Sequence, residues 1–438
     1  MPRGVVFWRA RAGVHEGRGA WTPTWELFVP PGGRAPDATR GLQLDVDADG
    51  FADAIVRDQN GDTATDRLHV YRGGAGGLNP ASDTVIALDT TFFGLPVVSA
   101  GDVNGDGFGD LAVSDGRGVV VYAGSAAGIT ATPLSVSPVL PGSFSFAWQL
   151  LAGGDVNGDG YGDVFVSDGG AHVWLYLGSP AGLPAAPAWT LDGSADGTAP
   201  RFLTAADLNG DGFADLAVKV YGAATGFRVF HGGAAGLESS AAGSLVLRPQ
   251  LLSGAAGDVN GDGIPDLVTS ELTQLAFFPG GQAFPAADPT EVVATPNQKA
   301  PLQIADFDGD GRADLAAVTS TGTDIIYFTD DRIDIYRGTP GGFSTTPHTT
   351  ILETAVLPDN TLNFGERISA ADFNGDGRSD LLVGAPAPFP TPFFDTTTPA
   401  VFVFPGSPAG VQPTPAPRIT GTPGYAGWLS AAAPGGVI

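Results

Sequence analysis

The chain has 438 residues, and 47 acidic against 21 basic residues give it a formal net charge of −26. Its 65 Gly and 36 Pro disfavour long helices, whereas a hydrophobic content of 43% excludes general disorder. The acidic balance disfavours nucleic acid as a partner. No apolar run approaches the roughly 18 residues of a transmembrane segment, and the absence of Cys excludes disulfides and thiolate metal sites.

The first residues of the chain carry no apolar stretch of the kind that a secretory signal peptide needs. The protein therefore either stays inside the cell or begins downstream of a removed signal. Two short segments rich in β-branched and aromatic residues follow, and we expect strands over Val5–Ala10 and Thr24–Phe28.

One nine-residue pattern, D-x-[DN]-x-D-G-x-x-D, organises the rest of the chain. It occurs seven times with its fixed positions intact, at an average spacing of 54.5 residues. The seven copies begin at Asp45, Asp102, Asp155, Asp207, Asp258, Asp306 and Asp372. We number these loops 1 to 7 and their positions 1 to 9. So many matches at a regular spacing indicate a repeat architecture.

Each loop lies between short segments that are typical of β-strands. In the second unit, Val97–Ala100 precedes the loop, Leu111–Val113 follows it, and Val119–Ala123 ends at a Gly turn. A more polar fourth segment closes each unit, as at Ala188–Leu191 in the third. Four strands per unit of about 50 residues predict an all-β fold, a β-propeller of four-stranded antiparallel blades. We expect the units to start near residues 41, 97, 150, 202, 253, 301 and 366.

The two ends of the chain look like parts of one further unit. Tyr425–Ala432 resembles a first strand, and the N-terminal segments resemble a third and a fourth. We therefore predict a closing blade split between about 1–30 and 424–438, which makes eight blades in a single domain, 1–438. The alternative is seven blades, with the terminal strands closing an ordinary blade or forming an appendage.

The spacing within each loop predicts a metal site. Oxygens at positions 1, 3 and 5 converge in a tight turn, Gly at position 6 permits positive φ, and the position 7 carbonyl and position 9 carboxylate complete an all-oxygen cage. Such ligands suit Ca²⁺, and the lack of His or Cys disfavours Zn²⁺ and Cu²⁺. The predicted ligands are Asp45, Asp47, Asp49, Phe51, Asp53, Asp102, Asn104, Asp106, Phe108, Asp110, Asp155, Asn157, Asp159, Tyr161, Asp163, Asp207, Asn209, Asp211, Phe213, Asp215, Asp258, Asn260, Asp262, Ile264, Asp266, Asp306, Asp308, Asp310, Arg312, Asp314, Asp372, Asn374, Asp376, Arg378 and Asp380.

Two other interpretations of the loop are disfavoured. An EF-hand needs a Glu at position 12, where these units have Val, Thr or Ala. A solvated Asp/Gly turn explains one copy but not seven crowded sets of carboxylates, which repel one another without a cation. We expect about seven Ca²⁺ ions, one per loop. The loops hold 23 of the 47 acids, so seven ions would reduce the formal charge from −26 to −12.

These loops, with Phe364–Gly365 and Gly384–Pro386 around the seventh, resemble the FG-GAP repeats of integrin α-subunit propellers and their bacterial relatives. The resemblance implies that the calcium loops join the first and second strands of each blade and lie on one face. It also implies the same ligands at positions 1, 3, 5 and 9, with the carbonyl at position 7. No inserted domain, transmembrane helix or cytoplasmic tail is seen in the sequence, so integrin signalling is not implied.

We therefore expect an adhesion or recognition module, extracellular or on the cell surface, with a composition that favours a bacterial source. It would be a monomer that binds a protein or glycan on the face opposite the loops, and Ala385–Thr398 is one candidate contact. A lectin is the alternative, although the seven Trp occupy no repeated position. A propeller lyase or hydrolase is disfavoured because no catalytic motif is present; we predict that the chain is not an enzyme.

Overall fold

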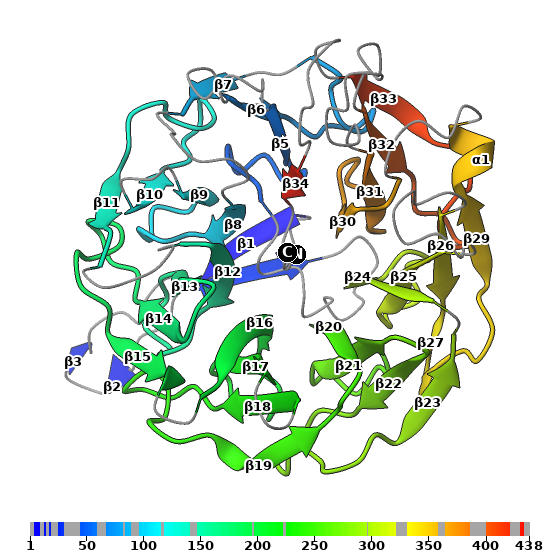
Figure 1. Cartoon of the computed structure of the whole chain (residues 1–438). Coiled ribbons are helices and arrows are strands. Elements are labelled where there is room, and N and C mark those ends of the chain that lie inside the picture. The colour runs from blue at the N-terminus through cyan, green and yellow to red at the C-terminus, as the bar shows by residue number, and fades with distance from the viewer. Residues whose placement is uncertain are drawn as a thin grey trace, which may run out of the picture.

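The computed structural model describes residues 4–8, 13–14, 17–18, 25–29, 44–58, 67–81, 84–88, 96–114, 118–140, 147–194, 197–221, 225–295, 297–320, 331–357, 364–385, 400–420 and 430–432. Seven four-stranded antiparallel sheets stand around a central axis as the blades of a propeller (Figure 1). We number each blade by the loop that precedes its second strand. The innermost strands surround the centre and the fourth strands form the periphery.

Blades 2 to 5 each contain four consecutive strands. Blade 2 comprises β8 (Val97–Gly101), β9 (Asp110–Ser114), β10 (Gly118–Tyr122) and β11 (Ser135–Pro138). Blade 3 comprises β12 (Gln149–Gly154), β13 (Asp163–Ser167), β14 (His172–Tyr176) and β15 (Trp189–Asp192). Blade 4 comprises β16 (Ala199–Ala206), β17 (Asp215–Tyr221), β18 (Gly226–Phe230) and β19 (Ala242–Leu247). Blade 5 comprises β20 (Leu251–Gly257), β21 (Asp266–Glu271), β22 (Gln274–Phe278) and β23 (Glu291–Ala294).

Blades 6 and 7 follow the same plan. Blade 6 comprises β24 (Gln298–Ala305), β25 (Asp314–Ser320), β26 (Asp331–Tyr336) and β29 (Thr349–Leu352). The short pair β27 (Gly338–Thr339) and β28 (Gly342–Phe343) lies between its last two strands, and α1 (Glu353–Val356) follows it. Blade 7 comprises β30 (Arg367–Ala371), β31 (Asp380–Ala385), β32 (Ala400–Phe404) and β33 (Ala416–Thr420).

The ring closes in blade 1, which combines the two ends of the sequence. Its outer strands are β5 (Ala54–Asp58), β6 (Arg67–Tyr71) and β7 (Thr84–Ala87), and its innermost strand is the C-terminal β34 (Ser430–Ala432). Strand β34 pairs with β5 in antiparallel register, with Ser430 opposite Arg57. The C-terminal segment is therefore a first strand, as expected, but it completes an ordinary blade.

The prediction of eight blades is wrong, and the alternative of seven is confirmed. Strands β1 (Gly4–Trp8) and β4 (Trp25–Val29) form a separate two-stranded sheet, as do β2 (Gly13–Val14) and β3 (Gly17–Arg18). Dividing 438 residues by the average repeat length gives about eight units, because this division counts the N-terminal part as a blade. Strands existed there as predicted, yet neither pair joins a sheet of the propeller.

The core consists of apolar layers between neighbouring blades. Along β10, Val120 packs toward blade 1, whereas Val119 and Val121 pack toward blade 3, because successive side chains of a strand face opposite sides. Within the described residues, seven such layers join the seven pairs of adjacent blades, including blades 7 and 1. Each blade is thus buried on both faces, which explains the nearly continuous Val, Leu and Phe content of the inner strands.

Candidate metal centres on the loop face

Each nine-residue loop directly precedes the second strand of its blade, and in blades 2 to 7 it connects the first strand to the second. The first Asp of each loop fixes the turn. In loop 2, Asp102 Oδ1 accepts hydrogen bonds from the amides of Gly105 (2.7 Å) and Asp106 (3.0 Å), and Oδ2 accepts one from Gly107 (2.8 Å). The two glycines have φ of +74° and +93°, a region that L-residues rarely adopt. The carboxylate at position 1 therefore organises the backbone that presents positions 3 and 5.

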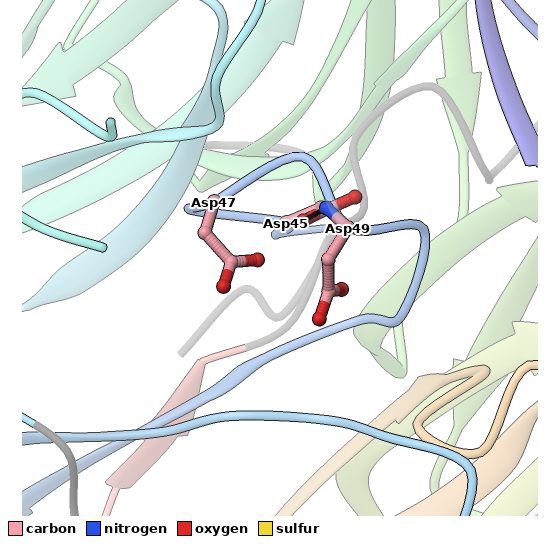
Figure 2. Close-up of side chains that lie close together, drawn as sticks. All are labelled: Asp45, Asp47 and Asp49. Atoms are coloured by element: carbon pink, nitrogen blue, oxygen red, sulfur yellow. Dashed lines mark hydrogen bonds between the residues drawn. The ribbon is translucent and has the colours of Figure 1, made fainter. Parts of the chain in front are cut away.

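Carboxylates gather inside the loops as the spacing predicts. In loops 1 and 6, one oxygen from each of positions 1, 3 and 5 lies within 4.8 Å of the others. Figure 2 shows Asp47 and Asp49 of loop 1 extending to the same side of the loop, next to Asp45. The other five loops have Asn at position 3, and in loop 2 the Asn104 amide group donates to Asp106 Oδ2 at 2.9 Å.

The Asp at position 9 is buried in every loop, with at most 2% of its surface exposed. Its contacts repeat in all seven units. In loop 3, Asp163 Oδ2 accepts the Val156 amide at position 2 (2.8 Å), and Oδ1 accepts the Gly178 amide after the third strand (2.9 Å). These seven residues are Asp53, Asp110, Asp163, Asp215, Asp266, Asp314 and Asp380. Position 9 therefore ties the loop to the next turn of its own blade, a role that the sequence did not suggest.

Burial strongly perturbs these carboxylates. Burial raises the pKa of Asp163 to about 8, against the hydrogen bonds from Gly178 and Val156 and with a further increase from nearby Asp155. Burial likewise raises the pKa of Asp53 to about 8 and of Asp380 to about 7. Burial thus disfavours the charged form of these carboxylates, and a bound cation would favour it.

Neighbouring loops are hydrogen-bonded to one another around the ring. The amide at position 8 of one loop donates to the position 1 carbonyl of the preceding loop, as Gly162 does to Asp102 at 2.7 Å. Ala52 of loop 1 donates in the same way to Asp372 of loop 7 at 3.0 Å, which closes the ring. Six of the seven loop pairs have this bond. Loop 5 has Pro265 at position 8, and proline has no amide hydrogen to donate.

Two further contacts lock the loops together. The residue at position 7 covers position 4 of the preceding loop: a Cβ placed on Gly105 would lie 2.6 Å from the Tyr161 ring. The glycine after each third strand sits between two loops, and a Cβ on Gly178 would lie 2.7 Å from the Val103 carbonyl oxygen. Side chains at position 2 anchor the loops in the core, since all seven are fully buried. These shared contacts place all seven loops on one face of the propeller, as the resemblance implied.

The residues fit a hard divalent cation. Asp47 Oδ1 is buried and accepts no hydrogen bond within the described residues, so this acceptor lacks a donor. Position 5 is solvent-exposed in most loops, for example at Asp106 and Asp262, which leaves a path for an ion. In loop 3, each oxygen of Asp163 accepts one amide hydrogen bond and keeps a second lone pair. The predicted ligand sets therefore remain predictions that the geometry permits.

Outside the loops, the described histidines contact structural groups. His172 Nδ1 lies 2.8 Å from Asp168 Oδ2, and its ring stacks on Trp174 at 5.4 Å. His231 and His348 each lie within hydrogen-bond distance of a backbone carbonyl of the next blade. His15 and most of the candidate contact Ala385–Thr398 lie outside the described residues.

Comparisons with known proteins agree with this repeat structure. The profile of the FG-GAP-like repeat matches residues 155–218 and 258–317, and that of the FG-GAP repeat matches residues 364–403. Integrin alpha-7 of Rattus norvegicus is 33% identical over 135 residues, 28% of this chain and 12% of the integrin. Integrin alpha-3 of Cricetulus griseus is 27% identical over 150 residues, 31% of this chain and 14% of the integrin. The match thus spans a small part of these relatives.

Solved structures give weaker similarity. BBS1N in complex with ARL6DN has a TM-score of 0.45 at 11% identity, covering 80% of this chain and 93% of that one. The exotype rhamnogalacturonan lyase YesX has a TM-score of 0.38 at 11% identity, covering 95% of this chain and 80% of that one. Neither similarity assigns a function to the chain. Among the described residues, no helix is long and apolar enough to cross a membrane. The chain is therefore a seven-bladed β-propeller with FG-GAP repeats, similar to the repeats of integrin alpha subunits.

Proposed function

We propose that the protein is a calcium-stabilised recognition module that acts outside the cell or at its surface. The observation that carries the calcium proposal is the cluster in loop 1, where oxygens of Asp45, Asp47 and Asp49 lie within 4.8 Å of one another and a buried Asp47 oxygen has no donor. Ca²⁺ accepts six to eight oxygen ligands in flexible geometry, which suits this set better than the strict octahedron of Mg²⁺. The bound ions would balance the charge of the loop face.

Calorimetry of the EDTA-treated protein titrated with CaCl₂ tests this proposal. We expect about seven ions per chain and a large rise in melting temperature, since a ligand present at 100 times its Kd stabilises the folded state by about 2.7 kcal/mol per site. Asp106→Ala should remove one ion from the stoichiometry. Asp288→Asn, an exposed carboxylate outside the loops, is the matched control and should bind as the wild type does. No heat of binding and an unchanged melting temperature would refute the proposal.

The face opposite the loops is proposed to bind the partner. The loops lie at the ends from which the second strands start. On the opposite face, therefore, the second strands end and the first strands begin. Large exposed apolar side chains occur there: Trp148 (56% exposed) directly precedes β12, Tyr221 (42%) ends β17, and Leu247 (60%) ends β19. Leu272 lies 48% exposed in the turn between β21 and β22. Four such side chains in blades 3 to 5 favour contact with a protein surface.

Screening against arrays of extracellular proteins and of glycans tests this second part. We expect binding that is lost in Trp148→Ala and in Tyr221→Ala but kept in Val292→Ala, which changes an outer strand. A glycan ligand is the second candidate, because exposed Trp and Tyr rings provide flat apolar surfaces for sugars. Binding that survives both substitutions would place the recognition surface elsewhere. A non-enzymatic, monomeric protein of bacterial source remains our prediction.

A further inference from the structure

Position 3 of the loops varies together with one residue elsewhere in the repeat. It is Asp in loops 1 and 6 and Asn in the other five. The residue before the glycine that follows each third strand is Arg in these two repeats alone, at Arg72 and Arg337. The five Asn-containing repeats have Ala123, Leu177, His231, Pro279 and Pro405 at this place. The seven copies within one chain thus provide an internal comparison.

The structure brings each of these Arg side chains onto its Asp. Arg72 Nη1 donates to Asp47 Oδ2 at 2.5 Å, and Nη2 donates to the Ala127 carbonyl of blade 2 at 2.5 Å. Arg337 Nε lies 3.2 Å from Asp308 Oδ2. The two Asp side chains are only 8% and 7% exposed. These two ion pairs therefore involve largely buried carboxylates. They differ in this from the exposed pairs between positions 5 and 7, such as Arg312 with Asp310.

The pairing compensates the additional carboxylate of loops 1 and 6. Loops 1 and 6 contain four Asp instead of three, and one nearby guanidinium offsets the additional negative charge. It also occupies one oxygen of Asp47 and leaves the other, Oδ1, buried without a donor. The same cation would repel an ion bound in the loop, because the two positive charges would be separated mainly by one carboxylate.

We propose that Arg72 and Arg337 set the calcium affinity of loops 1 and 6, acting as built-in counter-cations for the Asp at position 3. Each Arg stabilises its loop without metal and weakens the binding of the metal. Loop 1 lies in the blade where the C-terminal strand closes the ring, so this blade would remain ordered at low calcium. The inference rests on the proposed calcium binding.

Titration of the full chain with CaCl₂ alone, before and after EDTA treatment, tests the inference with Arg72→Gln. In EDTA, the variant should melt several degrees below the wild type, because Asp47 is left buried and unpaired. With saturating calcium the difference should shrink, and one site should bind roughly tenfold more tightly. The double variant Asp47→Asn/Arg72→Gln gives loop 1 the composition of an Asn-containing loop and should recover most of the melting temperature in EDTA.

The control is Arg67→Gln, because Arg67 lies at the far end of the same blade, at the start of β6. This substitution should change neither the calcium affinity nor the calcium-dependent shift in melting temperature. If Arg72→Gln lowers the melting temperature equally with and without calcium and no site binds more tightly, the arginine is only structural and the inference is wrong. If the wild type binds no calcium, the proposed function itself fails. The two failures are therefore distinguishable.

Discussion

The two faces of the propeller differ in how strictly they repeat. On the loop face, the segments that precede all seven second strands have the same nine-residue pattern, and position 9 makes the same pair of hydrogen bonds in each. On the opposite face, Leu272 and Thr273 alone connect β21 to β22, whereas β25 and β26 are separated by residues 321–330. The loop face is constrained by bonds shared between neighbours, and the opposite face is free to differ from blade to blade, which suits recognition.

The largest difference between the faces should appear at position 9. Asp163→Ala removes a buried carboxylate and leaves the amides of Val156 and Gly178 without an acceptor. We expect a loss of about 2–5 kcal/mol in the free energy of unfolding. Trp148→Ala, on the opposite face and 56% exposed, should cost less than about 1 kcal/mol. Urea denaturation in EDTA measures both without a contribution from metal, and equal losses would contradict the comparison.

Two adjacent glycines on the loop face provide a finer test. A Cβ on Gly73 would overlap the Ala52 carbonyl oxygen and lie 2.9 Å from that of Phe373, whereas a Cβ on Gly74 would have no atom within 4 Å. We expect Gly73→Ala to destabilise the fold by roughly 1–3 kcal/mol, because backbone atoms of two loops must move. Gly74→Ala should stay within about 0.5 kcal/mol of the wild type. Thermal melting of both variants checks this, and similar melting temperatures would mean that the loops are not tightly interlocked.

The hydrogen bond from the position 8 amide to the preceding loop can be removed at one pair of loops and added at another. Ala214→Pro removes the hydrogen bond from its amide to Asp155 (3.1 Å) and should cost about 1 kcal/mol. Pro265→Ala supplies the missing amide opposite Asp207, and we expect little net change in stability since the lost rigidity of proline offsets the new bond. Hydrogen exchange is the sharper measurement: the new amide at 265 should exchange as slowly as that of Ala313. Fast exchange there would show that loops 4 and 5 are not in contact as the others are.

Local chemistry made much of this structure predictable from the sequence. Asp and Gly at fixed spacing identify the loops, and short β-branched segments identify four strands per blade. The blade that the C-terminal strand completes was not predictable, because β34 has only three residues and pairs with β5 more than 370 residues earlier. A strand's own pattern indicates that it is a first strand, not which blade it completes. The eight-blade prediction failed at this step.

The contacts between loops were missed for a related reason. Gly105 is needed partly because Tyr161, one repeat later, covers it, so the cause of the glycine lies in another unit. The role of position 9 in bonding the Gly178 amide is similarly invisible within nine residues. A signal was available for the arginines: Arg72 and Arg337 accompany Asp at position 3 and are absent when it is Asn. Comparing repeats position by position beyond the loop would have found them.

The smallest expected effect concerns the one loop that departs from the glycine pattern. Loop 1 has Ala48 at position 4 with φ of +55°, where the other six loops have Gly with φ between +70° and +79°. An L-residue in this region costs about 1–2 kcal/mol, whereas Gly loses about 0.5–1 kcal/mol more entropy on folding than Ala does. Ala48→Gly should therefore stabilise the protein by about 0.5 kcal/mol. Urea denaturation in EDTA, with Gly105→Ala as the reverse substitution in loop 2, measures the difference. Gly105→Ala should be clearly destabilising, since its Cβ would also meet Tyr161; a loss of stability in Ala48→Gly would mean that the Ala48 methyl group packs favourably enough to outweigh its backbone strain.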